Sequence, residues 1–275
     1  DVAEFDGEET IDALDAALTQ LGHAVERVGN VHALAEALVA GRRWDLVYNI
    51  AEGLGGRSRE AQVPALLEAY GLPYTCSDPL VCAATLDKAV AKRLVASAGL
   101  PTPPFTVVRE MADLRQLDLA YPLFAKPLAE GTGKGITQNS LIADAESLRA
   151  VVAELLETCR QPVLVEEYLS GREFTTAILG TGEAARVLGT MEVIIARDDG
   201  QTVYSYENKE HWEQHVRYEW PQDELTAEVE RLALASYRAL ECRDTGRVDI
   251  RCDRRGRPSF MEINPLPGIH PQHSD

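Results

Sequence analysis

The chain has 275 residues, of which 45% are hydrophobic and 26% charged, and its formal net charge is −17. This length and composition allow one or two globular domains with a sizeable core, and they exclude a fibrous or disordered chain. Because so acidic a surface repels phosphate backbones, nucleic acid is not expected as a partner.

The sequence also argues against a membrane or secreted protein. No apolar run approaches the roughly 20 residues that a membrane-spanning helix needs, and the first residues, DVAEFDGEET, are acidic and lack the apolar stretch of a signal peptide. The five cysteines have no CxxC spacing, and their odd number indicates reduced thiols. We therefore expect a cytoplasmic protein with no membrane partner.

Residues 1–78 are predicted to form an N-terminal α/β domain. Apolar residues recur at helical spacing over residues 11–21 and 31–40. Short apolar segments at residues 24–28 and 45–50 are interpreted as strands. An alternation of helices and strands indicates a parallel sheet with crossover helices.

The rest of the chain is predicted to be α+β, with a central domain at residues 79–165 and a C-terminal domain at residues 166–275. Two helices, EAQVPALLEAYGLPY and TLDKAVAKRLVASAG, precede a linker at residues 100–105. Short strands then follow one another, interrupted by helices near residues 144–159 and 223–240. The predicted strands are YPLFAKP, PVLVEEYL, EFTTAILG, VLGTMEVII, GRVDIRC and PSFMEINP. Consecutive strands joined by short turns indicate antiparallel sheets.

The segment GRVDIRCDRRGRPSFMEINP is interpreted as two strands joined by a turn at residues 253–256. Residues two apart on a strand face the same way, so Glu262 and Asn264 share a face, as do Arg247 and Asp249. Two carboxylates and an amide oxygen on one sheet suit magnesium with a nucleotide triphosphate. The alternative is a solvated face of alternating charge, and the turn length leaves open whether both pairs face one cavity.

A second motif is Lys126 with the loop that follows it. An apolar strand leads to this lysine, and Gly131, Gly133 and Gly135 come next at alternate positions. Such a loop can bring backbone N–H groups close to phosphate oxygens, and a lysine beside it supplies a positive charge. The alternative is a flexible surface loop.

Three weaker candidates complete the set. Lys88 and Lys92 lie four apart on one predicted helix, a spacing that more often gives two solvated side chains. Glu166 and Glu173 follow an apolar strand, where carboxylates could accept hydrogen bonds from an adenine amino group and from ribose hydroxyls. Lys209 lies in a polar segment with aromatic residues that is interpreted as a loop.

The order of these motifs resembles the ATP-grasp superfamily, and two segments are similar to the D-alanine–D-alanine ligases: GLPYTCSDPLVCAATLDKAVAKRLVASAGLPTP and VEEYLSGREFTTAILG. The resemblance implies that the nucleotide lies between two antiparallel sheets. It also implies an ATP-dependent carboxylate–amine ligase that forms a peptide bond through an acyl phosphate. It further implies two magnesium ions, replaceable by manganese, small amino-acid or amine substrates, and a homodimer.

The resemblance assigns the binding of the nucleotide and its metal ions to one group of residues. Lys88 and Lys126 would hold the α- and β-phosphates. Glu166 and the backbone near Leu169 would contact adenine, and Glu173 the ribose. The glycine loop would contribute Gly131 and Gly133, and the two metal ions would be bound by Asp249, Glu262 and Asn264.

The resemblance assigns contacts with the γ-phosphate, the oxyanion and the two substrates to a second set of residues. Lys209, in a mobile loop, would contact the γ-phosphate, and Arg247 would stabilise the developing oxyanion. Glu4 would hold the amino group of the first substrate and Ser274 the carboxylate of the second, while Thr132 replaces the family's serine in the glycine loop.

Two departures concern the substrates. Glu52 and Glu210 stand where those ligases carry histidine and tyrosine. With Glu4 they would make the acyl-substrate end anionic and favour a first substrate with extra positive charge over D-alanine, unless Glu52 pairs with Arg57 or Arg59. Three functions stay open: a dipeptide-forming ligase, a ligase of other acids or amines in secondary metabolism, and a nucleotide-binding protein without catalysis.

Overall fold

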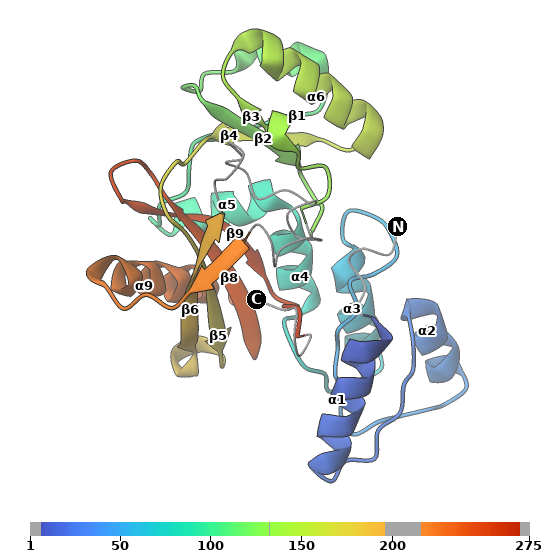
Figure 1. Ribbon diagram of the computed structural model, residues 1–275. Helices are drawn as coiled ribbons and strands as arrows, with labels where there is room; N and C mark the ends of the chain where they lie inside the picture. Colours follow the sequence, from blue (N-terminus) through green and yellow to red (C-terminus); the bar gives the residue numbers. More distant parts are fainter. Residues whose placement is uncertain (1–6, 132, 196–215, 270–275) are drawn as a thin grey trace.

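The computed structural model describes residues 7–131, 133–195 and 216–269 of the chain. Figure 1 shows a group of helices at the lower right, a small sheet at the top and a larger sheet at the lower left. The space between the two sheets is bordered by helices from the middle of the chain. Within the described residues no helix combines the length and apolar character needed to cross a membrane.

The N-terminal part consists mainly of helices. Its elements are α1 (Glu8–Gln20), α2 (Val31–Val39), the 3-10 helix η1 (Arg59–Ala61) and α3 (Gln62–Ala69). The two strands predicted here do not form a sheet among the described residues, where the one parallel bridge joins Val47 and Tyr74. The prediction of a strand at residues 24–28 is wrong, because Val28 packs into the apolar cluster without entering a ladder of backbone hydrogen bonds.

Two helices lead from this part to the sheets. Helix α4 (Pro79–Leu86) was not predicted, although Asp78 accepts hydrogen bonds from the N–H groups of Leu80 and Val81, as an N-cap does. Helix α5 (Lys88–Ser97) was predicted, and Asp87 caps it in the same way. The α5 helix borders the space between the sheets in Figure 1, so its side chains can contact both.

The upper sheet has four antiparallel strands in the order β1-β4-β2-β3. They are β1 (Phe105–Val108), β2 (Leu123–Pro127), β3 (Leu141–Ile142) and β4 (Val163–Glu167). Helix α6 (Ala145–Cys159) covers the outer face and packs on Leu123 and Ala125. Two 3-10 helices, η2 (Met111–Gln116) and η3 (Gln138–Ser140), lie in the connections. Because strand side chains alternate, Phe124 and Lys126 face the lower sheet.

The lower sheet has five antiparallel strands in the order β7-β6-β5-β8-β9. They are β5 (Glu173–Leu179), β6 (Arg186–Ile195), β7 (Val216–Glu219), β8 (Thr245–Cys252) and β9 (Pro258–Asn264), with η4 (Gly182–Ala184) between β5 and β6. Helix α9 (Glu224–Ala239) packs against its apolar face. The predicted α+β region with two antiparallel sheets is therefore confirmed.

Candidate active site

The two sheets form the walls of one cavity. Phe124, Lys126 and Glu166 line it from the upper sheet, and Glu173, Thr175, Arg247, Asp249 and Glu262 line it from the lower sheet. Lys126 and Asp249 therefore face the same cavity, although they belong to different sheets. This is the arrangement expected for a ligand held between two antiparallel sheets.

A bulge in the β8–β9 hairpin decides which side chains reach the cavity. Asp249 lies opposite Glu262, whereas its neighbour Ile250 lies opposite Phe260, so Met261 is an extra residue on β9. If Met261 were instead paired regularly with Asp249, Glu262 would lie opposite Val248, whose side chain points into the core. The bulge therefore places both carboxylates on the cavity face.

Arg247 and Asn264 complete that face. They are direct partners across the same two strands, one pair farther along the hairpin. The sequence left open whether the two pairs share a face, and the register shows that they do. Asn264 is the last residue of β9 and lies next to the carboxylate pair.

Asp249 is held in place by two neighbours. Thr175 Oγ1 donates a hydrogen bond to its Oδ1 at 2.9 Å, and Arg247 reaches both carboxylate oxygens at 3.1 and 3.0 Å. Burial raises the pKa of Asp249, Arg247 lowers it, and the nearby Glu262 raises it further. A cation between the two carboxylates would relieve the burial and the repulsion together.

Lysines and glutamates alternate beneath the glycine loop. Lys126 Nζ lies 3.3 Å from Glu166 and 3.4 Å from Glu262. Lys92 Nζ lies 2.7 Å from Glu166, and Lys88 Nζ lies 3.6 Å from Glu262. The buried charge network, as we call these five residues, joins α5 to both sheets.

Burial makes this network sensitive to the loss of any member. The side chains of Lys92 and Glu166 are 0% exposed. Burial opposes the charged form of Glu166, but Lys126 and Lys92 hold its pKa below the usual range. Lys92 was interpreted as a solvated side chain, and the structure corrects this, because its ammonium also donates to Thr102 Oγ1 at 3.1 Å.

The far end of the cavity contains the predicted nucleoside contacts. Leu169 is buried and lines the cavity. Glu173 lies 3.3 Å from Arg251, whose guanidinium donates to Tyr168 Oη at 2.9 Å and stacks over its ring. A carboxylate, a cation and an aromatic ring thus lie together where a base and a ribose were predicted to bind.

The glycine loop turns back on itself beside Lys126. Lys134 N donates to Gly131 O at 3.1 Å, and Ile136 N donates to Gly133 O at 2.9 Å. Gly133 lines the cavity and has a φ of 72°, which favours glycine. Gly135 is required for packing as well, because a Cβ there would lie 2.6 Å from Pro127 Cγ.

Several predicted residues cannot be placed. Glu4, Thr132, Lys209, Glu210 and Ser274 lie outside the described residues. Among the residues that are described, no three or more His, Cys, Asp or Glu side chains gather as a ready metal site. The predicted metal ligands are two carboxylates and one amide, so their role stays a prediction.

Comparisons with known proteins agree with this architecture. A family model described as D-ala D-ala ligase C-terminus matches residues 94–274. A D-alanine–D-alanine ligase of Bordetella petrii is 36% identical over 86% of this chain and 70% of its own length. An uncharacterized protein of Sinorhizobium fredii, y4sG, is 34% identical over 82% of this chain and 66% of its own length. The chain thus spans about two thirds of the length of such relatives.

Solved structures give the same result. The VanG D-Ala:D-Ser ligase of Enterococcus faecalis superposes with a TM-score of 0.68 at 27% identity, over 84% of this chain and 66% of that one. A D-alanine–D-alanine ligase of Bacillus anthracis, at 23% identity, superposes with a TM-score of 0.75 over 97% of this chain and 83% of that one, which supports the fold. From the matched family model and these likenesses, the chain has the ATP-grasp fold and belongs to the D-alanine–D-alanine ligase C-terminal family.

Proposed function

We propose that this protein is an ATP-dependent ligase that joins a carboxylate to an amine. The observation that carries the proposal is the single cavity in which Lys126 faces the Asp249–Glu262 pair. In this reaction a substrate carboxylate attacks the γ-phosphate of ATP, giving ADP and an acyl phosphate. The amine then attacks the acyl carbon and phosphate leaves, which is largely a matter of positioning and charge neutralisation.

The nucleotide would lie along the cavity between the sheets. Lys88 and Lys126 would neutralise the α- and β-phosphates, supported by their position beneath the glycine loop. Glu166 and the backbone near Leu169 would contact adenine, and Glu173 would contact the ribose. The alternation of charge in the network fixes the lysines before the nucleotide arrives.

The carboxylate pair fits magnesium. Asp249, Glu262 and Asn264 would hold two ions, with manganese as a substitute, because hard cations prefer such oxygen ligands. Bound magnesium would neutralise charge on the triphosphate. The raised pKa of Asp249, caused first by burial and increased by Glu262, supports a site that needs a cation.

The remaining roles concern the acyl group. Arg247 would stabilise the oxyanion of the tetrahedral intermediate, supported by its place beside the carboxylate pair. We assign the γ-phosphate to Lys209, the first substrate's amino group to Glu4, the second substrate's carboxylate to Ser274, and a loop contact to Thr132. These assignments rest on the resemblance of motifs.

The substrates are proposed to be amino acids or amine-bearing acids. The names of the relatives favour D-alanine. A second candidate, a ligase for a more cationic first substrate, is favoured by Glu52 and Glu210. Arg57 pairs with Asp87 at 2.6 Å, so of the two arginines that could neutralise Glu52, Arg59 stays the alternative to this candidate. A binder without catalysis is disfavoured, because it has no need of Asp249, Glu262 and Asn264.

Two measurements test the proposal. ADP release with magnesium should be abolished in Asp249→Ala and in Glu262→Ala, while Glu183→Ala, which removes an exposed carboxylate, should behave like the wild type. Near-normal turnover in either site variant would contradict the metal assignment. A panel of basic, neutral and acidic amino acids then identifies the substrate, and efficient turnover with D-alanine alone would refute the preference for a cationic one.

The proposal also covers the localisation and the oligomeric state of the protein. We place it in the cytoplasm as a homodimer acting on small molecules, and these assignments rest on the resemblance of motifs. Sedimentation of the purified protein tests the dimer directly, and a monomer at micromolar concentration would exclude it.

A further inference from the structure

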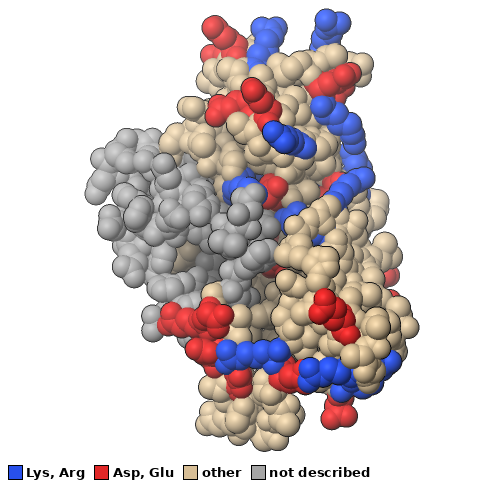
Figure 2. All heavy atoms as spheres, turned by 90° about the vertical axis from the view of Figure 1, so that its right-hand side faces the viewer, with Lys and Arg blue, Asp and Glu red and all other residues tan. Residues whose placement is uncertain are grey.

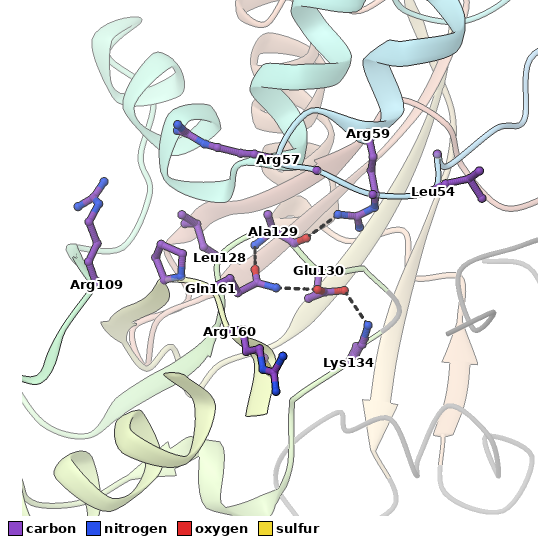
Figure 3. Close-up of a pocket in the computed structure, with 15 residues that line it drawn as sticks. Leu54, Arg57, Arg59, Arg109, Leu128, Ala129, Glu130, Lys134, Arg160 and Gln161 are labelled. Atoms are coloured by element: carbon purple, nitrogen blue, oxygen red, sulfur yellow. Dashed lines mark hydrogen bonds and ion pairs between the residues drawn. The ribbon is translucent and has the colours of Figure 1, made fainter. Parts of the chain in front are cut away.

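A second cavity lies beside the glycine loop and shares no lining residue with the candidate active site. Three regions surround it: residues 53–59 of the N-terminal part, residues 128–130 with Lys134 at the glycine loop, and residues 159–162 before β4. Figure 3 shows its floor, formed by Leu128, Ala129 and Gln161. Its volume is about 480 Å³, which is within the range of small-molecule sites.

The charge of this cavity is opposite to that of the molecule. Five basic residues and one acidic residue line it, which gives 5 − 1 = +4, whereas the whole chain carries −17. In Figure 2, several Lys and Arg side chains follow one another along the right-hand edge of the upper part of the molecule. A concave site of one sign attracts ligands of the other sign.

Part of the positive charge is built into the cavity wall. Arg59 is buried, and its Nη1 donates to Ala129 O at 2.9 Å. Glu130 is already occupied, because it accepts from Gln161 Nε2 at 2.6 Å and lies 3.4 Å from Lys134. Arg57 is paired as well, with Asp87 at 2.6 Å.

Two arginines at the cavity are available to bind a ligand. Arg109 follows β1 and Arg160 follows α6, and both are exposed at the cavity. Within the described ranges, neither guanidinium has a hydrogen bond or an ion pair. Figure 3 shows Arg57, Arg109 and Arg160 around the floor rather than crossing it. An occupant would thus meet arginine from more than one side.

We propose that this cavity binds an anionic small molecule that carries phosphate or carboxylate groups. Arginine forms charge-assisted and often bidentate hydrogen bonds with both kinds of group. The site differs from that of the ATP phosphates, because Gly133 and Ile136 line the active-site cavity whereas Lys134 lines this one. The glycine loop therefore separates two anion sites.

The test is calorimetric titration of the protein with its active site already filled. A non-hydrolysable ATP analogue with magnesium is held at saturation, and inorganic phosphate or citrate is added at constant ionic strength. We expect saturable binding of at least one anion. The two arms identify whether phosphate or carboxylate is preferred.

Matched variants locate the binding. Arg109→Gln with Arg160→Gln should weaken the affinity at least about tenfold, because charge-assisted hydrogen bonds are lost. Arg109→Lys with Arg160→Lys keeps the charge and should retain part of the affinity. Arg255→Gln, at the exposed β8–β9 turn, should bind like the wild type. No saturable binding of either anion, or an unchanged affinity in the double glutamine variant, would overturn the proposal.

Discussion

The buried charge network and the ion pairs of helix α1 use the same side-chain chemistry in opposite surroundings. In the network, Lys92 and Glu166 are separated by 2.7 Å and are 0% exposed. Beside α1, Arg27 lies 2.8 Å from both Asp12 and Asp15 of that helix, but its side chain is 44% exposed. Distance alone therefore does not distinguish the two regions, whereas burial does.

This difference in burial indicates what each group of ion pairs contributes to the protein. Exposed pairs are weakened by water and salt and contribute little to stability. Buried pairs carry a desolvation cost that can exceed their attraction, so they are poor evidence for stability. A network that joins α5 to both sheets at the floor of a ligand cavity is better explained by the need for fixed lysines.

The largest effect is expected from Lys92→Met. Removing this ammonium leaves Glu166 buried with Lys126 alone, and the free energy of unfolding should fall by about 3–5 kcal/mol. Urea denaturation measures the loss. The double variant with Glu166→Leu should recover part of it, because no unpaired charge remains. A loss below about 1 kcal/mol in the single variant would mean that water reaches Glu166, since screened pairs cost little.

A middle-sized effect is expected from Thr175→Val, which removes the hydroxyl that donates to Asp249. The free energy of unfolding should fall by about 1 kcal/mol. Because the lost bond favours the ionised form, the pKa of Asp249, already raised by burial, should rise further. The acid side of the pH profile for magnesium-dependent ADP release should therefore move to higher pH.

Thr176→Val is the matched control. Its hydroxyl contacts Thr190 Oγ1 at 3.1 Å in the interior, away from the cavity. We expect a similar loss of stability with no change in the pH profile. If both variants shifted the profile equally, the effect would come from the strand and not from the bond to Asp249.

The smallest effect is expected from Arg27→Gln. This change removes the ion pairs of Arg27 with three acidic residues of α1, Glu8, Asp12 and Asp15. The melting temperature should therefore fall less than in Lys92→Met or Thr175→Val. The difference from the wild type should disappear in high salt, which screens exposed charges. A salt-independent loss as large as that of Lys92→Met would remove the contrast between the regions.

Local sequence patterns predicted most of the fold. Sequence patterns located six of the α-helices among the described residues, and apolar segments located the long strands of both sheets. The strand β1 (Phe105–Val108) was not predicted, and its first residue was assigned to the linker; it exists because β4 pairs with it along its length. Helix α4 was missed because its sequence, PLVCAATL, is apolar on nearly every side and therefore shows no helical period.

The site was predicted in part. Lys126 could be found because it lies near the end of an apolar strand, and Asp249 because it is a charged residue inside one. The burial of Lys92 could not, because a lysine on a helix becomes buried only when a distant carboxylate, here Glu166, meets it. The shared face of the two carboxylates was undecided for a similar reason, since a bulge depends on pairing between strands.

The extra residue Met261 has a consequence for which changes in chain length the protein can accept. Toward the tip, residues 253–257 form a turn beyond the last strand pair, so an insertion there would lengthen a loop and leave the pairing intact. Deleting Met261 would make Phe260 and Glu262 neighbours opposite Ile250 and Asp249, so the carboxylates would stay paired and only the bulge would be lost. Deleting Ile263 would instead put Asn264 opposite Val248, whose side chain lies in the core. The two parts of one hairpin thus differ in tolerance: its tip and its bulge can change in length, while the segment from Glu262 to Asn264 must keep its length for both side chains to face the cavity.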